Sequence, residues 1–324
     1  MTKIPVIIDS DPAITVPFAD VDDALAIFLA LNSDKLEVDG ITTVFGNTHI
    51  DNAFRIAGDL LKVAQRPDIP LFKGAYNGSW LGVRTPAVKF IIDQVMEHPG
   101  EITLVTLAPL TNVASAFLLE PRLVENLKSL LMMGGYFFPQ NFKLPLIRSE
   151  FNFSRDAMAT RIVLDQDLDT TIIGLDTTTQ VLFSDLHFVA LQRAQTPITD
   201  YLAKNIKSWL IFNKIITFGA GFNPHDPICI AYLLQKSLFK YVNASVQIYV
   251  SERKKSNNYI HKQYSNDLFH LLTSLLAREG ESQTTVPFSD SRLHKIKIST
   301  HIHEKNFLKL LISKLSQDLP SNRT

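Results

Sequence analysis

The feature that most constrains this chain is a repeated alternation of short apolar runs with stretches of helical spacing. A β-branched run at 4–8 is followed by a helical pattern over 22–33, and the same order recurs up to about residue 174. Apolar runs of this kind are typical of parallel strands buried on both faces, and parallel strands need crossover helices between them. The alternation therefore predicts an α/β fold with an open, mainly parallel (mixed) sheet flanked by helices.

The pattern assigns most of the chain to specific elements. Strands are expected at 4–8, 38–44, 69–72, 102–107, 127–133 and 170–174, and helices at 22–33, 51–63, 86–97, 112–119 and 156–164. Beyond these, the pattern predicts mostly helix over 183–222, an irregular part over 251–295 with two polar surface loops (252–258 and 279–285), and a closing amphipathic helix over 304–315. Because no internal repeat or linker interrupts the pattern, we expect a single domain over 1–324.

Composition excludes several classes of protein. Hydrophobic residues make up 46% of the chain, which indicates a globular fold, and 32 basic side chains balance 32 acidic ones, which argues against nucleic acid as a partner. The single cysteine, Cys229, excludes an internal disulfide and fits a reducing compartment. No apolar run approaches the roughly 20 residues of a membrane span, and the first residues lack a signal-peptide pattern. The expected location is the cytoplasm, with no membrane partner.

Polar clusters follow three of the expected strands. They are Asp9-Ser10-Asp11, Phe45-Gly46-Asn47 and Gly134-Gly135, each directly after an apolar run. In open α/β sheets, ligands bind beyond the carboxyl ends of the strands, and the three clusters fall at that edge. The pattern alone therefore predicts a binding site there.

The first cluster belongs to an acidic group that has three possible explanations. Five acids, Asp9, Asp11, Asp20, Asp22 and Asp23, fall within fifteen residues. Carboxylates this close repel one another unless a cation such as Ca²⁺ or Mg²⁺ neutralises them. A solvated loop with acids at a helix start is the second explanation. The third is a phosphotransferase of the haloacid dehalogenase type, in which a strand ends in Asp-x-Asp, although Ala13 stands where Thr or Val is usual.

Five segments, taken together, resemble the nucleoside hydrolase family. In the family's order, they are Asp9-Ser10-Asp11-Pro12 with Asp22-Asp23-Ala24-Leu25-Ala26, then 41–47, 104–112, Met133-Gly134-Gly135 with Glu150-Phe151-Asn152, and His225-Asp226-Pro227. The resemblance implies a nucleoside hydrolase-like fold, a bound Ca²⁺, and hydrolysis of ribonucleosides to ribose and free base by a homodimer or homotetramer. A nucleoside- or ribose-binding homologue with impaired catalysis and the Asp-based phosphotransferase are the alternatives.

The resemblance also implies which residues carry out the reaction. Asp11 is expected to be the general base and a calcium ligand, and the other ligands are Asp23, Asp226 and the backbone carbonyl of Leu107. His225 is expected to protonate the leaving base, since the family branch with His-Asp at this point places an imidazole there. This branch favours a pyrimidine-preferring or broad enzyme.

Four further residues are implied to hold the sugar. The ribose hydroxyls are expected to contact Asp22, Asn47, Glu150 and Asn152. Such contacts orient and distort the sugar with binding energy that is remote from the base.

The chain departs from the family pattern in three places. Nine residues separate Pro12 from Asp22 where the family has two, and the inserted residues are expected to loop out so that the acids on either side still meet. The stretch after Gly74 is shorter than the family's mobile loop, with 76–82 in its place. Finally, 140–149 does not match the family's Asn-x-Thr-Pro pattern.

Overall fold

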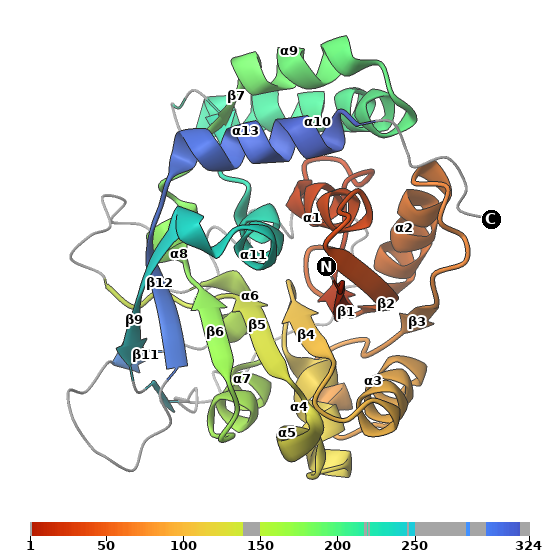
Figure 1. The fold of residues 1–324 in the computed structure, drawn as a ribbon, viewed down its shortest axis with the longest axis vertical. Coiled ribbons are helices and arrows are strands. Elements are labelled where there is room, and N and C mark those ends of the chain that lie inside the picture. The colour runs from red at the N-terminus through yellow and green to blue at the C-terminus, as the bar shows by residue number, and fades with distance from the viewer. Residues whose placement is uncertain are drawn as a thin grey trace, which may run out of the picture.

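A computed structural model describes residues 2–138, 150–216, 219, 221–244, 246–249, 283–285 and 296–317. Its main sheet has eight strands in the order β3 (Leu71–Lys73), β2 (Leu36–Thr43), β1 (Ile4–Ser10), β4 (Thr103–Thr106), β5 (Ser129–Met133), β6 (Thr170–Ile173), β12 (Ile296–Ile302) and β9 (Phe239–Ala244). Neighbouring strands pair in parallel except β12 and β9, which are antiparallel at one edge. The predicted α/β class with an open, mixed, mainly parallel sheet is confirmed (Figure 1).

Helices cover both faces of this sheet (Figure 1). One layer contains α1 (Asp22–Leu31), α2 (Ile50–Val63), α9 (Asp185–Ala194), α10 (Pro197–Ile216), α11 (His225–Leu234) and α13 (Glu304–Leu315). The other contains α3 (Pro86–Glu97), α4 (Thr111–Leu119), α5 (Leu123–Asn126) and α7 (Ala157–Leu164). The shorter elements are α6 (Phe151–Arg155), α8 (Leu175–Thr178) and the 3-10 turns η1 (Gly78–Trp80) and η3 (Lys236–Leu238).

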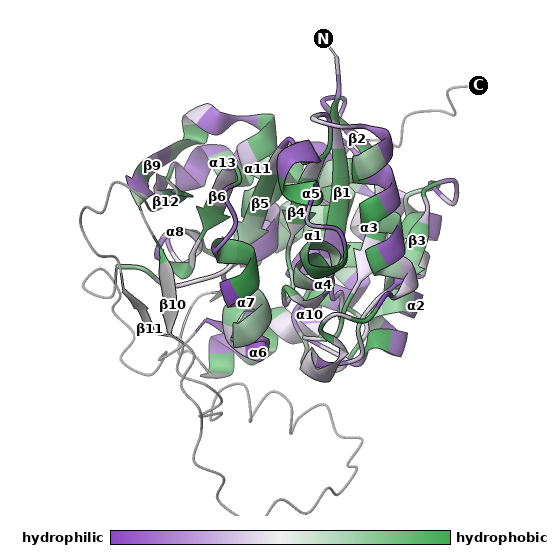
Figure 2. Cartoon of the chain, turned by 90° about the horizontal axis from the view of Figure 1, so that it is seen from below, coloured by the Kyte–Doolittle hydropathy of each residue, from purple (hydrophilic) through white to green (hydrophobic). Residues whose placement is uncertain are grey.

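Strand β1 shows why two helical layers are needed. Val6 and Ile8 belong to the apolar cluster on one face, Ile7 belongs to the cluster on the other, and none of the three is exposed. Because successive side chains of a strand point to opposite faces, an unbroken apolar run places apolar side chains on both faces of the sheet. Each face therefore needs its own layer of helices. Figure 2 shows β1 in the green of apolar residues.

Two small antiparallel ribbons accompany the main sheet. The strands β7 (Phe183–Ser184) and β8 (Gly221–Phe222) bracket α9 and α10, so the part predicted as mostly helical begins and ends in a strand. The strand β11 (Gln283–Thr285) pairs with β10 (Gln247–Tyr249). The surface loop predicted up to residue 285 is therefore wrong at these three residues, because a partner distant in the chain decides the pairing. The other predicted loop, 252–258, lies outside the described residues.

Helix α1 carries acids into the interior. All of its residues from Asp22 to Leu31 are buried, and it packs against α11. A helix buried on every side brings the polar residues of its first turn inside as well, so Asp22 and Asp23 have almost no contact with solvent. Within the described ranges, no helix has the length and apolar character that crossing a bilayer requires.

The insertion before α1 folds onto the protein instead of looping out. Residues 13–19 form two consecutive turns, which backbone hydrogen bonds of 2.7 and 3.2 Å close. Ile14 and Val16 are buried in the apolar core, while Phe18 adopts a left-handed φ of 61° and places its ring centroid 5.3 Å from that of Phe212 on α10. The insertion is thus a compact structure that leaves the start of α1 beside the end of β1.

Candidate active site

The carboxyl ends of the central strands lie side by side. Asp9, near the end of β1, pairs with Thr42 of β2 and with Thr106 of β4. The segments that leave these strands begin at the same edge of the sheet. The amino end of α1 contacts the end of β1 through Asp23, and the amino end of α11 contacts α1 through Asp22. This is the edge at which the sequence predicted a site.

Three acids form a buried group at this edge. Asp22 and Asp23 come from α1 and Asp226 from α11, and one carboxylate oxygen of each lies within 4.8 Å of the others. The group contains two of the predicted metal ligands, Asp23 and Asp226. It also contains Asp22, which the resemblance implies for the ribose. Asp11, the third predicted acidic ligand, lies beside the group and is held to it through Asp23.

Asp11 is fixed by contacts on two sides. Its backbone N–H donates to Asp23 Oδ1 at 3.1 Å, and its Oδ2 accepts the backbone N–H of Asn47 at 2.5 Å. The Asn47 side-chain amide donates to Asp23 Oδ2 at 3.1 Å and to Asp11 Oδ1 at 3.4 Å, so it bridges the two acids. A Cβ on Gly46 would lie only 1.7 Å from Asp11 Oδ2, so the close approach requires glycine there.

Asp22 is held by the amino end of α11. Its Oδ2 accepts the backbone N–H groups of His225 at 3.0 Å and of Asp226 at 3.2 Å, and its Oδ1 accepts that of Asp23 at 3.1 Å. Unpaired N–H groups and the helix dipole make the first turn of a helix favourable for a carboxylate. These contacts explain how segments 204 residues apart come together at the acid group.

The electrostatics of this site favour protons or a cation. Burial raises the pKa of the Asp23 carboxyl to about 7, with repulsion from Asp22 adding to the rise, and burial also raises the pKa of Asp9 to about 7. Burial, with repulsion from neighbouring acids, raises the pKa values of Asp11, Asp22 and Asp226 well above the usual range. Removing carboxylates from water disfavours their charge unless a positive charge balances it.

The donor set fits a hard divalent cation. The group offers carboxylate oxygens, and none of its acids forms an ion pair with a lysine or arginine of the described residues. Nearby, Asp9 Oδ2 is buried without a hydrogen-bond partner in that same part of the chain. Ca²⁺ and Mg²⁺ prefer oxygen ligands of this type, so a metal ion can be held here.

The predicted sugar-binding residues on the other side of the site are tied to the backbone. Glu150 caps α6: its carboxylate accepts the N–H groups of Asn152 at 2.7 Å and of Phe153 and Gly135 at 2.9 Å each. The Asn152 side-chain amide donates to the carbonyl of Leu107 at 3.1 Å. Leu107, a predicted metal ligand, therefore lies next to a predicted sugar ligand, and its carbonyl is already in contact with Asn152.

Sequence reasoning missed two hydroxyls that contact site residues. Ser10 Oγ donates to Asp23 Oδ1 at 2.5 Å, and Thr178 Oγ1 lies 2.7 Å from Nδ1 of His225. Ser10 stands between the two acids of the first motif, and Thr178 follows the end of β6. Their position at or after the end of a strand is the sequence signal that could have identified them. Burial lowers the pKa of His225 to about 4, which makes its imidazole neutral near neutral pH.

Residues 76–82, which we expect to stand in place of the family's longer loop, form a compact segment. It contains η1, and the backbone N–H of Gly82 donates to Ser115 Oγ at 2.9 Å. Trp80 packs against the small apolar cluster around Val44 and lies 4.7 Å, centroid to centroid, from Tyr76. Trp80 thus packs against Val44 and Ala108, which follow β2 and β4.

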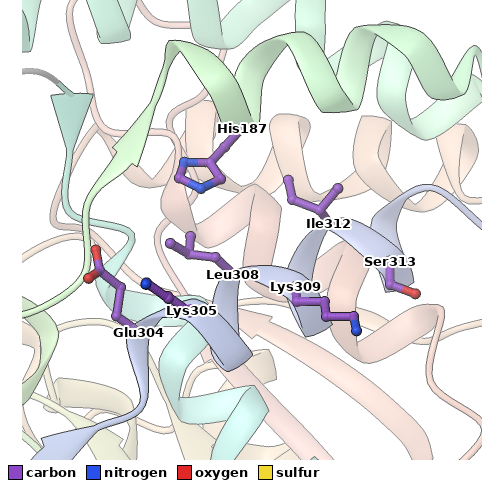
Figure 3. A pocket seen from close by; sticks show the side chains of 7 residues that line it. All are labelled: His187, Glu304, Lys305, Leu308, Lys309, Ile312 and Ser313. Carbon is purple, nitrogen blue, oxygen red and sulfur yellow. The ribbon is translucent and has the colours of Figure 1, made fainter.

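A separate groove lies between α9 and α13. It has a volume of about 620 Å³ and is lined by His187 of α9 and by the face of α13 that runs from Glu304 to Ser313 (Figure 3). None of the predicted site residues lines it, and its one carboxylate, that of Glu304, accepts the backbone N–H of Leu182. The groove therefore lacks the group of carboxylates that lies at the strand ends.

Known proteins resemble this chain in sequence and in fold. The family model described as "Inosine-uridine preferring nucleoside hydrolase" matches residues 6–309. A "Probable uridine nucleosidase 2" from Arabidopsis thaliana is 31% identical, covering 76% of this chain and 82% of the relative. The "Pyrimidine-specific ribonucleoside hydrolase RihB" of Escherichia coli is 29% identical over 78% and 85%. A solved structure titled "Plant nucleoside hydrolase - PpNRh1 enzyme" superposes with a TM-score of 0.78 at 25% identity, covering 97% of this chain and 99% of the other.

Proposed function

This chain belongs to the inosine-uridine preferring nucleoside hydrolase family and hydrolyses the N-glycosidic bond of ribonucleosides, and from that premise we propose that it uses Ca²⁺ and a water molecule activated by Asp11. The proposed ligands are Asp11, Asp23, Asp226 and the carbonyl of Leu107. When bound, the ion supplies positive charge that lowers the pKa of a water molecule and orients it. The family match removes the phosphotransferase alternative.

One observation carries the proposal. Asp22, Asp23 and Asp226 bring carboxylate oxygens within 4.8 Å of one another in the interior, and none of the three forms an ion pair with a lysine or arginine of the described residues. Gathering these acids is unfavourable for an apo-protein at neutral pH, and it becomes favourable when a divalent cation is present. Asp22, whose carboxylate the amides of α11 hold, is the acid of this group that we assign to the ribose.

The chain's own groups then perform the substitution at C1′ of the ribose. Asp11 takes a proton from the attacking water, and the water oxygen forms a bond to C1′ as the bond from C1′ to the base nitrogen breaks. The electron pair of that bond leaves with the base, to which the N–H of the neutral His225 imidazole donates a hydrogen bond, and the released base takes its proton from water. Asn47, Asp22, Glu150 and Asn152 hold the hydroxyls of the sugar while C1′ becomes cationic.

We propose pyrimidine ribonucleosides, uridine first, as the preferred substrates. The names of two relatives, a uridine nucleosidase and a pyrimidine-specific ribonucleoside hydrolase, support this choice, as does the His225-Asp226 pair. The insertion suggested a catalytically impaired homologue, but Asp11 and Asp23 are in contact across it at 3.1 Å.

The test is release of ribose from uridine, cytidine, inosine and adenosine in the presence of Ca²⁺, with reducing sugar as the readout. We expect hydrolysis that EGTA abolishes and added Ca²⁺ restores, with uridine the best substrate. Calorimetry that shows bound calcium and bound nucleoside but no ribose from any of the four would contradict the proposal. If Mg²⁺ restored hydrolysis and Ca²⁺ did not, the proposed ion would be wrong while the proposed ligands would be retained.

Location and assembly complete the proposal. We assign the enzyme to the cytoplasm, supported by the one cysteine, Cys229, which is free and buried. We also assign it a homodimeric or homotetrameric state, supported by the apolar side chains of Leu186 and Ile215, which are 80% and 66% exposed on the adjacent helices α9 and α10. Size-exclusion chromatography with light scattering tests the assembly, and a monomeric mass at micromolar concentration would contradict it.

A further inference from the structure

We propose that Thr178 is a positioning residue that orients His225 toward the leaving base. The observation is the 2.7 Å distance between Thr178 Oγ1 and Nδ1 of His225, which joins the end of α8 to the start of α11. Thr178 has no exposed surface, so solvent does not compete for this hydrogen bond. The inference rests on the proposed role of His225 and extends it to a residue from a different element.

Neighbouring threonines show that the contact is specific to one position. The Thr177 hydroxyl accepts from Ser299 Oγ at 2.8 Å, on β12, and the Thr179 hydroxyl donates to the carbonyl of Leu175 at 2.6 Å. Both therefore serve the fold. Of the three consecutive threonines, Thr178 alone reaches the histidine.

The two segments that carry the pair are locked to each other. The Asn223 side-chain amide, two residues before His225, donates to the carbonyl of Val181 at 2.6 Å. The backbone N–H of His225 itself donates to Asp22. Both partners thus sit on fixed backbone, so the Thr178 hydroxyl can determine how the imidazole ring is turned.

The hydrogen bond also determines which ring nitrogen is left for the substrate. In the part of the chain that the structure describes, Thr178 Oγ1 has no backbone acceptor, so its proton is available to Nδ1 of His225. A neutral imidazole that accepts at Nδ1 carries its proton on Nε2. Nε2 then becomes the donor that meets the departing base, and a ring flip that exchanged the two nitrogens would break the contact with Thr178.

The test compares two leaving groups in purified, calcium-loaded enzyme. Uracil is a poor leaving group that needs a proton or a hydrogen bond, whereas p-nitrophenolate leaves from p-nitrophenyl β-D-ribofuranoside without either. We expect Thr178→Val to lower kcat for uridine by about tenfold to a hundredfold and kcat for the nitrophenyl riboside by less than about threefold. Thr178→Ser keeps the hydroxyl and is expected to recover most of the uridine activity.

Matched controls separate positioning from folding. Thr177→Val and Thr179→Val remove neighbouring hydroxyls and are expected to leave the ratio of the two activities as in the unaltered enzyme. An equal loss on both substrates in Thr178→Val, or no loss on either, would overturn the inference while hydrolysis by the unaltered enzyme upholds the proposed function. An unaltered enzyme that cleaves neither substrate with calcium bound would instead contradict the proposed function itself.

Discussion

The site contains two sets of buried carboxylates that differ in whether neighbouring acids repel them. In the acid group of α1 and α11, Asp22, Asp23 and Asp226 face one another, and burial with mutual repulsion raises the pKa of each. On the other side of the site, Glu150 accepts three backbone N–H groups and Asp176 accepts those of Phe137 and Phe138 at 2.8 Å each.

The difference separates the carboxylates that a cation has to balance from those that only backbone N–H groups contact. A carboxylate that accepts several N–H groups has part of its charge balanced by the backbone and stabilises the local fold, although burial still raises the pKa values of Glu150 and Asp176. Carboxylates that face one another also repel, even though Asp22 itself accepts three backbone N–H groups. This repulsion destabilises the apo-protein unless protons or a bound cation offset it. The two sets should therefore respond in opposite directions to the same chemical change, removal of a charge.

The largest effect is expected for Asp226→Asn. The substitution removes a proposed calcium ligand, so we expect calcium affinity to fall and kcat for uridine to drop by about a thousandfold or more. Because it also relieves repulsion from Asp22, the melting temperature in EGTA should stay unchanged or rise. Calorimetric titration with Ca²⁺, ribose release and thermal unfolding in EGTA measure the three outcomes. A variant that is less stable in EGTA and still binds calcium normally would contradict the proposed difference between the two sets of carboxylates.

The next effect concerns pH and calcium. The folded-state pKa values of Asp23 and Asp9 are about 7, whereas an unfolded aspartate titrates near 4, so the folded protein holds protons that the unfolded chain releases. Stability of the metal-free protein should therefore decrease as pH rises from about 4 to about 7 and level off above the folded pKa.

Calcium competes with these protons, so the stabilisation that it provides should grow over the same pH range. Melting temperatures measured in EGTA and in excess Ca²⁺ across this range test both statements. A metal-free protein that becomes more stable as pH rises through this window would show that the acids are balanced by something other than protons.

A moderate loss of stability is expected for Glu150→Gln, in contrast to the unchanged or raised stability in EGTA that is expected for Asp226→Asn. The amide retains one acceptor oxygen but turns its NH₂ group toward backbone N–H donors, so the cap of α6 is weakened. We expect a loss of about 1 kcal/mol in the free energy of unfolding, in EGTA and in calcium alike. Urea unfolding provides the measurement, with Asp176→Asn as the matched case. Stabilisation of the metal-free protein by Glu150→Gln would place this residue with the mutually repelling acids.

The smallest effect is expected for Asp20→Asn. Asp20 accepts the backbone N–H of Val21 at 2.7 Å and that of Asp22 at 3.3 Å, contacts that an asparagine oxygen can also make, and it is not part of the three-acid group. Calcium affinity and kcat for uridine should change by less than about threefold. A loss of calcium affinity comparable to that of Asp226→Asn would make Asp20 a ligand supplied by the insertion.

Local patterns in the sequence determined the elements and the edge that carries the site. The apolar run at 4–8 predicted a strand covered on both faces, and the structure buries Val6, Ile7 and Ile8 in the two layers. The motifs at Asp22-Asp23 and His225-Asp226 identified the family and the nucleoside hydrolase activity. These features depend on neighbours in the chain or on motif order, which a sequence displays directly.

Only the tertiary structure decided which of these residues touch. The contacts of Asp22 with the amides of α11, of Asn152 with the carbonyl of Leu107, and of Thr178 with His225 join segments that lie 45 to 204 residues apart. The antiparallel pairing of β9 with β12 likewise joins distant strands. Such contacts depend on how α1 packs on α11 and on the order of the strands in the sheet. Neither can be derived from the spacing of residues along the chain.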